Sequence, residues 1–423
     1  MTGRRSTSAY GDGRDRRVST VTVALAFVTA MLGTTLPTPL YPLYEAQFGF
    51  GGLTVTVVFA TYAVGVICGL LLFGQASDAL GRKRVLVPGL ILSALSAVVF
   101  LVAPSLGHLG TAALIVGRAL SGLSAGIYTG TATATLVDLA PQELRRRAAL
   151  LAALANILGL GLGPLLAGLL ASWAPAPTRS VFVVDLVLVA AALAALAVIP
   201  EPHPAGEAVR WRPQVPRLPS RGRAEFLAAG VLGFAGFAVL GLFTAVAPLF
   251  LTQVLGDHAP WLTGVVVAAV FVSSAAGQVA AEHTLARWAI PLASVGLTVG
   301  MTFIVAGLLA SSLALVVLAG LASGFSQGAG FKAALQSVTA LAAEDERARV
   351  VSMFFTLLYL GIAFPIVGLG LLTQVWGLMT AGVAFATAVS LIGIALFIVS
   401  VARPDTFRAA SRNEPERHEA PTT

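Results

Sequence analysis

The chain has 423 residues, of which 57% are hydrophobic and only 11% are charged, and its mean hydropathy is +0.89. A soluble globular chain is about 25% charged, so this composition excludes a large soluble domain and predicts an all-α polytopic membrane protein. The single cysteine, Cys68, excludes an intrachain disulfide. The net charge of +7 is attributed to loop topology rather than to nucleic-acid binding, because basic loops orient membrane helices.

Apolar runs of about 20 residues are long enough to cross a bilayer as helices. The sequence predicts twelve such spans, which lie in chain order at 20–42, 54–73, 85–103, 111–134, 148–172, 180–199, 226–251, 262–281, 290–310, 313–338, 350–374 and 378–401. The first follows a basic segment, as the apolar part of a signal peptide does. We interpret it as a span, because it is long for a signal sequence and its removal would leave an odd number of spans.

The basic residues orient these spans. With the N-terminus inside, 23 of the 26 Lys and Arg residues fall in inner segments, Arg179 falls in an outer loop, and Arg118 and Lys332 fall within spans. Positive residues concentrate in cytoplasmic loops, so both termini are expected in the cytoplasm. The marked excess of Arg over Lys favours a GC-rich bacterial genome, and hence a multi-pass protein of a bacterial cytoplasmic membrane.

The two halves of the chain resemble each other at a nearly constant offset. The segment GLSAG at Gly122 matches GFSQG at Gly324, and Pro164 matches Pro365. We therefore expect two six-helix bundles, at 20–199 and 226–401. A Pro- and Arg-rich cytoplasmic linker at 200–225 joins them, and disordered cytoplasmic tails at 1–19 and 402–423 flank them. Two related bundles predict alternating access to a site at their interface.

GLSAG and GFSQG also fit the GxSxG pattern of hydrolase nucleophiles. That chemistry needs a strand-to-helix turn, whereas these segments lie inside apolar spans. Glycines four residues apart on a membrane helix let a neighbouring helix approach closely, so we expect close helix packing here.

The segment GQASDALGRKRVL lies between the second and third spans. It resembles the signature G-x-x-x-D-(R/K)-x-G-R-(R/K) of the major facilitator superfamily, and the matching positions are Gly74, Asp78, Gly81, Arg82 and Lys83. Ala79 stands where the family has a basic residue. The resemblance runs from the first span to the last, and it implies a twelve-helix fold of two pseudo-symmetric six-helix bundles. It also implies a cytoplasmic gate, in which we expect Asp78 to accept hydrogen bonds at the start of the eleventh span.

The segment LIVGRALSGLSAG resembles the family's fourth-span signature and places Arg118 deep in an apolar run. A charge at the centre of a bilayer costs about 2.5–3.5 kcal/mol on insertion scales, so such a residue is by default functional and paired. The alternative is an arginine that extends to the membrane surface.

The segment GLGLGPLLAG resembles the family's fifth-span signature, and the matching residues are Gly159, Gly163, Pro164 and Gly168. Ala167 replaces one glycine. In the family this signature is typical of exporters, commonly drug–proton antiporters. Pro164 removes a backbone donor and bends the helix. The alternative interpretation is plain small-residue packing.

The sequence lacks a Walker A motif, so ion coupling is the expected energy source. We hypothesise that Asp185 in the sixth span works with Arg118, because burial and a nearby cation act oppositely on the ionisation of a carboxylate. The alternative is that Asp185 is an interfacial acid near Arg179. Glu45, at the outer end of the first span, is a second candidate for proton coupling. Lys332 is either interfacial or faces the cavity, where it would favour anionic substrates.

The sequence therefore predicts a secondary-active, proton-coupled exporter of small organic molecules, such as drugs or metabolites, that works as a monomer. The expected partners are a small-molecule substrate, protons and the lipid bilayer. The alternatives are an importer of a sugar or organic acid, and a non-transporting membrane sensor. No catalytic residues, metal site, cofactor or nucleic-acid partner are predicted, and we do not expect an enzyme.

Overall fold

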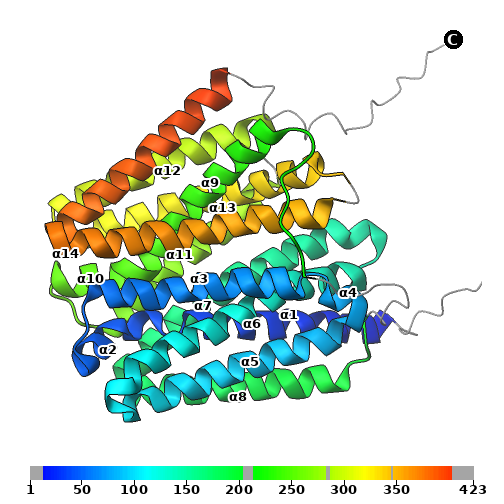
Figure 1. The fold of residues 1–423 in the computed structure, drawn as a ribbon, viewed down its shortest axis with the longest axis horizontal. Helices are drawn as coiled ribbons and strands as arrows, with labels where there is room; N and C mark the ends of the chain where they lie inside the picture. The colour runs from blue at the N-terminus through cyan, green and yellow to red at the C-terminus, as the bar shows by residue number, and fades with distance from the viewer. Residues whose placement is uncertain (1–12, 203–212, 283–285, 344–345, 403–423) are drawn as a thin grey trace, which may run out of the picture.

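The computed structural model describes residues 13–202, 213–282, 286–343 and 346–402, and these residues form helices without a strand (Figure 1). Before the linker lie α1 (Gly13–Thr35), α2 (Tyr41–Phe48), α3 (Gly52–Phe73), α4 (Ala76–Leu80), α5 (Arg82–Val102), α6 (Gly110–Leu139), α7 (Arg145–Trp173) and α8 (Pro177–Val198). After it lie α9 (Arg223–Gly241), α10 (Ala247–Gln253), α11 (Pro260–Ala281), α12 (Ala286–Leu309), α13 (Leu313–Leu341) and α14 (Arg347–Ala402). Short helical turns join several of these helices.

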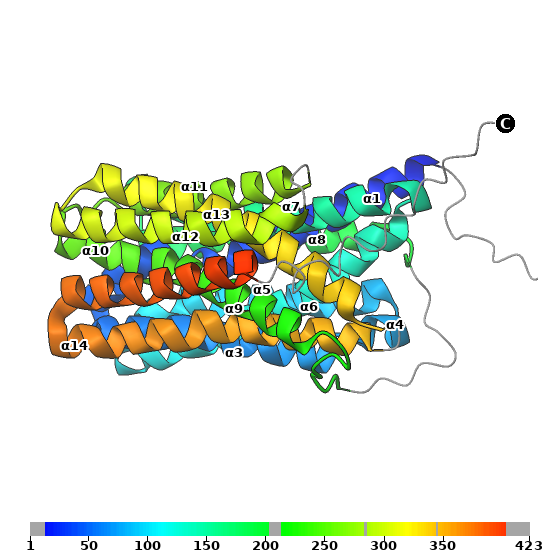
Figure 2. The ribbon, with the colours of Figure 1, turned by 90° about the horizontal axis from the view of Figure 1, so that it is seen from above.

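Among the described residues, eleven helical stretches are long and apolar enough to cross a membrane. The last, α14, has 56 residues, which corresponds to about 84 Å of straight helix at 1.5 Å per residue. It is interrupted at Gly377, whose φ of 79° and ψ of 164° are not helical. Figures 1 and 2 show the red part after this point folded back from the orange part before it. Helix α14 therefore contains the last two predicted spans, and the predicted fold class is confirmed.

In each half, the first helix is interrupted before its predicted span ends. Helix α1 starts at Gly13, earlier than predicted, and ends at Thr35, and a turn over Thr38–Leu40 leads into α2. Prolines supply no backbone N–H, and Pro37, Pro39 and Pro42 explain this break. In the second half the π-helical turn Leu242–Val246 separates α9 from α10. Such turns are often found at functional sites.

The glycines of the repeated segments bring helices into backbone contact. A Cβ atom added to Gly126 would lie 2.5 Å from the Val66 carbonyl oxygen of α3, and Gly122 lies as closely against Tyr62. In the second half, Gly324 and Gly328 of α13 pack in the same way against α11. The predicted close packing of GLSAG and GFSQG is thereby confirmed.

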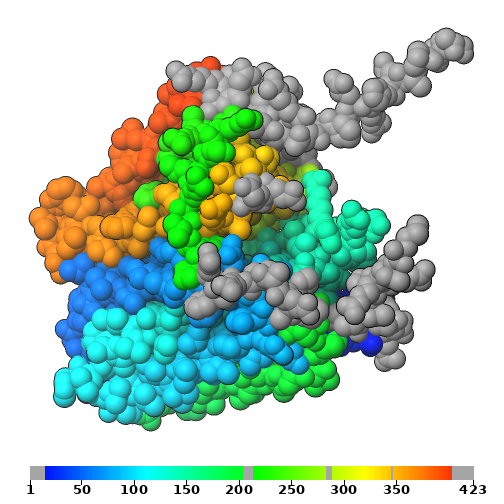
Figure 3. Space-filling view, turned by 45° about the vertical axis from the view of Figure 1, so that its right-hand side comes forward, coloured from blue at the N-terminus to red at the C-terminus, as the bar shows by residue number. Residues whose placement is uncertain are grey.

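The described residues 213–222 of the linker pack along one end of the molecule, which we call the linker end. The helix that follows it, α9, starts at Arg223, inside the predicted linker range. Figure 3 shows the green residues before α9 crossing from the orange second half to the blue first half. The Gln214 backbone N–H donates a hydrogen bond to the Leu71 carbonyl at 2.7 Å. Large apolar side chains such as Val187, Phe364 and Leu391 are exposed on the helices, as a lipid-facing surface requires.

Candidate functional site

A cavity of about 540 Å³ lies between the two halves of the chain. Its walls come from α1, α3, α6 and α7 of the first half and from α9, α11, α13 and α14 of the second. This volume lies within the range of about 300–1,000 Å³ that is common for small-molecule sites. Among the described lining residues, three carry charge: Arg118, Asp138 and Lys332.

Close backbone contacts shut the cavity off at the end opposite the linker. A Cβ atom added to Gly168 of α7 would lie 2.5 Å from the Pro260 carbonyl oxygen of α11. Gly370 of α14 lies equally close to the side chain of Thr56 in α3. Both contacts join the first half to the second. At this end, the two halves are therefore in direct contact.

At the linker end the cavity walls continue to the ends of the helices. Asp138 lies in the last turn of α6, and Ala149 and Val351 lie in the first turns of α7 and α14. The described structure therefore presents its cavity towards the linker end.

Arg118 lies in α6 with 1% of its surface exposed, so its side chain does not extend to the membrane surface. Its Nη1 donates a hydrogen bond to the Thr34 carbonyl in the last turn of α1. Carbonyl groups in a last turn lack backbone partners, and a helix C-terminus favours a cation. The Phe59 and Tyr62 rings lie 5.2 and 5.1 Å from the guanidinium carbon, within cation–π range.

Asp185 of α8 is 2% exposed, and its Oδ1 is buried without a hydrogen-bond partner. No ion pair joins it to Arg118 in the described part of the chain. Instead, both side chains contact neighbouring residues of α1. A Cβ atom added to Gly33 would lie 3.1 Å from Asp185 Oδ2, and the next carbonyl, that of Thr34, accepts from Arg118. The hypothesised pair is thus linked through α1 rather than by direct contact.

Two of the alternatives raised by the sequence can be placed. The Arg179 guanidinium donates a hydrogen bond to Ser105 Oγ at 2.7 Å, so its partner is not Asp185. Glu45 lies in α2 and is partly exposed. Neither Glu45 nor Asp185 is among the described residues that line the cavity.

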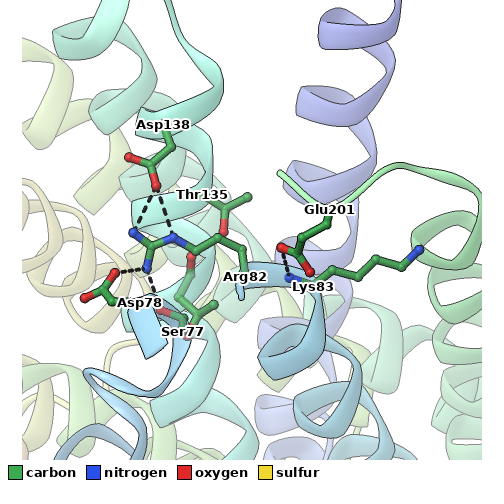
Figure 4. Close-up of polar contacts among 8 residues, drawn as sticks. Ser77, Asp78, Arg82, Lys83, Thr135, Asp138 and Glu201 are labelled. Carbon is green, nitrogen blue, oxygen red and sulfur yellow. Dashed lines mark hydrogen bonds and ion pairs between the residues drawn. The ribbon is translucent and has the colours of Figure 1, made fainter. Parts of the chain in front are cut away.

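The residues of the second-to-third-span signature join helices of the first half (Figure 4). Arg82 is almost buried and lies between two carboxylates, at 2.6 Å from Asp78 and 2.9 Å from Asp138. It also donates a hydrogen bond to Ser77 Oγ at 2.5 Å. Asp78 pairs with Arg82 at a half-exposed position, and its expected contact with the start of the eleventh span stays a prediction.

The other signature residues explain the turn itself. Gly81 has a φ of 103°, a backbone conformation that favours glycine. Lys83 Nζ donates to the Ala197 and Ile199 carbonyls at 2.8 and 2.9 Å and so caps the end of α8. Gly74 leaves room for the linker, because a Cβ atom there would lie 2.8 Å from the Gln214 side chain.

Glu282 and its two cationic partners form a charged cluster that connects the two halves at the linker end. Glu282, at the end of α11, lies 2.6 Å from Arg146 of α7 and 2.7 Å from Lys332 of α13. Burial raises the pKa of Glu282, but hydrogen bonds from Lys332 and Arg146 outweigh it and hold the pKa below its ordinary value. Since Arg146 belongs to the first half and Glu282 to the second, this ion pair spans the interface.

The fifth-span signature faces both halves. Gly159 and Gly163 of α7 pack against α1, where a Cβ atom on Gly159 would lie 2.7 Å from Met31 Cβ. Gly264 of α11 packs against the Pro164 carbonyl. Pro164 has no N–H to donate to the Leu160 carbonyl four residues earlier, and Thr35 Oγ1 donates to that carbonyl at 2.9 Å instead. The signature thus fixes the position of α1 and of the interface.

Aromatic rings of both halves form one wall of the cavity. The Tyr62 and Tyr359 rings meet across the interface with centroids 6.5 Å apart. Phe237 lies 5.7 Å from Tyr359 and 5.8 Å from Phe331, whose ring is 6.1 Å from that of Phe355. All five residues line the cavity. Such a wall suits an apolar or aromatic solute.

Comparison with known proteins agrees with this architecture. The family model of the Major Facilitator Superfamily matches residues 23–306, and the chain belongs to this family of transporters. It is 28% identical over 144 residues to the bacillibactin exporter of Bacillus subtilis (34% of this chain, 36% of that one). It is 29% identical over 140 residues to the quinolone resistance protein NorA of Staphylococcus aureus (32% and 35%). These matches span only about a third of each relative.

The fold also matches that of a solved transporter. The crystal structure of a bacterial homologue of the human lysosomal transporter Spinster, inward-facing and occupied, superimposes with a TM-score of 0.68. The match covers 95% of this chain and 98% of that one at 14% identity. This likeness establishes the shared fold.

Sequence reasoning missed the Arg146–Glu282 ion pair and the aromatic wall. Glu282 directly follows the eighth predicted span, and its partner comes from the other half of the chain. The aromatic residues sit at ordinary spacings within apolar spans, so nothing in the sequence marks which of them face the interface.

Proposed function

We propose that this protein is a secondary-active exporter that moves small organic molecules out of a bacterial cell by alternating access, in exchange for protons. The observation that carries this proposal is the cavity between the two halves, closed at one end by backbone contacts and continuous to the helix ends at the other. With the positive-inside orientation, the linker end faces the cytoplasm. The described state is then the one that accepts cargo from inside.

Asp185 is the proposed proton carrier. It is a buried carboxylate in α8 with an oxygen that lacks a hydrogen-bond partner, and burial of an unpaired charge is costly. It contacts Gly33, next to the Thr34 carbonyl that binds Arg118 in the cavity wall. A change in the charge of Asp185 would therefore move the end of α1 and, with it, the Arg118 side chain. Coupling in this proposal passes through α1.

The Arg146–Glu282 ion pair is the proposed cytoplasmic gate. It joins α7 to the end of α11 at 2.6 Å, and it must break if these ends separate. Asp78 and Arg82 hold α4, α5 and α6 together within the first half, so they keep the first half rigid during this movement. The contact that we expected between Asp78 and the eleventh span remains a prediction for the outward-facing state.

The test is proton movement that depends on cargo. Everted membrane vesicles are energised to an acidic interior that a pH-sensitive dye reports, and drugs, sugars and organic acids are added in turn. We expect at least one compound to dissipate the gradient with wild-type protein and to leave it intact with Asp185→Asn. Glu45→Gln is the carboxylate comparison, because Glu45 is partly exposed whereas Asp185 is buried. If Asp185→Asn exchanges protons as the wild type does, Asp185 is not the carrier.

An exporter is favoured over an importer by two observations. The helix α7 signature that is typical of exporters has its glycines and proline at the contacts that fix α1 and the interface. The bacillibactin exporter and NorA are the relatives that match in sequence. If cargo instead moved together with protons and accumulated on the side of lower proton concentration, the importer would be the correct alternative.

A further inference from the structure

We infer that the cargo is an amphipathic organic anion, whose acidic group binds at the Arg118 end of the cavity and whose apolar body lies along the aromatic wall. This inference rests on the proposed transport function and adds its substrate class. Its basis is the balance of charge in the cavity.

Arg118 brings a positive charge into the cavity without a carboxylate to neutralise it. In the described part of the chain it forms no ion pair, and its contacts are the Thr34 carbonyl and three aromatic rings. Its buried Nε has no hydrogen-bond partner. A buried charge is costly until it is paired, so an anionic group of the cargo would complete this site.

The surroundings of Lys332, the second cation that lines the cavity, also carry a surplus of positive charge. Lys332 lines the cavity and shares Glu282 with Arg146, so two cations face one carboxylate. The one acidic residue among the described lining residues, Asp138, is held by Arg82. A cationic cargo would therefore meet Arg118 and Lys332 with no carboxylate free to receive it. Like-charge contact of this kind excludes wrong ligands.

The aromatic wall, together with Phe59, favours an apolar body in the cargo. Phe237, Phe331 and Phe355 present ring faces and edges from the second half, and Phe59 and Tyr62 do so from the first. Phe59 and Tyr62 also flank the guanidinium of Arg118. An aromatic acid can therefore contact the cation and the rings at once.

Two dyes with the same xanthene skeleton test the charge preference directly. Fluorescein is anionic at pH 7.4, and rhodamine 123 is cationic. Each is titrated with the purified full-length protein, and binding is read from fluorescence polarisation. We expect fluorescein to bind at least tenfold more tightly. Equal binding, tighter binding of rhodamine 123, or no saturable binding of fluorescein would overturn the inference.

A variant that adds a charge avoids the risk that Arg118→Gln unfolds the end of α1. Gly130 of α6 lines the cavity, and a Cβ atom added there meets nothing within 4 Å. Gly130 lies twelve residues after Arg118, which corresponds to about 18 Å along the axis of α6. We expect Gly130→Asp to lower the ratio of fluorescein to rhodamine 123 affinity at least threefold relative to the isosteric Gly130→Asn. An unchanged ratio would show that the dyes bind outside this cavity, and the inference would fail.

Transport separates this inference from the proposed function. If proteoliposomes driven by a pH gradient move rhodamine 123 and not fluorescein, the protein is a proton-coupled transporter and the substrate class is wrong. If fluorescein binds with the expected preference but no gradient moves it, the anion site stands and the proposed function fails.

Discussion

Removing Arg146 or Glu282 should shift the transporter towards its inward-open state by the same amount, because the ion pair must break when the cytoplasmic ends separate. The Arg146–Glu282 ion pair is the contact of this cluster that joins the two halves, because Lys332 lies in the same half as Glu282. The Arg146 side chain is 72% exposed, so solvent screens the pair and its worth is about 0.2–1 kcal/mol. This corresponds to a shift of roughly 1.4- to 5-fold in the conformational equilibrium.

The two substitutions should differ in their effect on stability. Glu282→Gln leaves Lys332, which is 11% exposed, without its counter-charge, and an unsatisfied charged group costs about 1–3 kcal/mol or more. Arg146→Gln leaves the Lys332–Glu282 ion pair in place. We therefore expect a lower thermal unfolding midpoint for Glu282→Gln and little change for Arg146→Gln.

The assay is labelling of a cysteine at the closed end. Thr56 is 1% exposed and packs against Gly370, so Thr56→Cys should react with a membrane-impermeant maleimide only when that end opens. Cys68 is exposed and is first replaced by Ser. Both gate variants should label about 1.4- to 5-fold more slowly, and the double variant no more slowly than either. Additive effects, or unchanged rates, would refute the assignment of this ion pair as the gate.

Three further predictions follow from particular contacts. Thr35→Val should lower the free energy of unfolding by about 1–3 kcal/mol, because it leaves the Leu160 carbonyl unpaired. The loss should be smaller in a Pro164→Ala background, where a backbone N–H is available. Chemical denaturation of the wild type, both single variants and the double variant checks this, and equal losses in the two backgrounds would contradict it. Gly163→Val should lower the free energy of unfolding by about 1–3 kcal/mol or more, because the added side chain overpacks against Thr35 and Leu32. Gly130→Val, at an open position, should lower the melting temperature less. The Glu282 pKa lies below its ordinary value, so the gate ion pair is fully present above about pH 4.3 and is lost as the pH falls through the lowered pKa. The ratio of the Thr56→Cys labelling rates with and without Arg146→Gln should therefore be constant from pH 8 to 6. A ratio that changes in this range would show that the gate titrates.

The architecture could be predicted from the sequence because the membrane leaves few options. Apolar runs must form helices, and the glycines of GLSAG and GFSQG predicted that the fourth and tenth spans each pack closely against a neighbour, which the structure shows to be α3 and α11. The sequence predicted one span over 20–42, whereas α1 ends at Thr35, because a run of apolar residues does not show where a helix stops and a short one begins. Gly377 separates two predicted spans that the structure joins in α14.

The functional contacts were harder to predict because they depend on partners from distant segments. The depth of Arg118 followed from hydropathy, but the Thr34 carbonyl that it binds became available only because α1 ends there. The expected partner of Asp78 came from the family resemblance, whereas the nearest cation is Arg82, four residues along the chain. Arg146 and Glu282 are 136 residues apart, and no local pattern links them.

The central claim is that the two ends of this protein open in alternation around one cavity, and paired spin labels test it most directly. On the Cys68→Ser background, one pair is placed at Arg147 and Ala348 at the linker end and the other at Ala46 and His258 at the opposite end, all at exposed positions. We predict that adding fluorescein at pH 7.4 shortens the distance across the linker end and lengthens the distance across the opposite end. A constant distance across the opposite end, under conditions where fluorescein binds, would contradict the account.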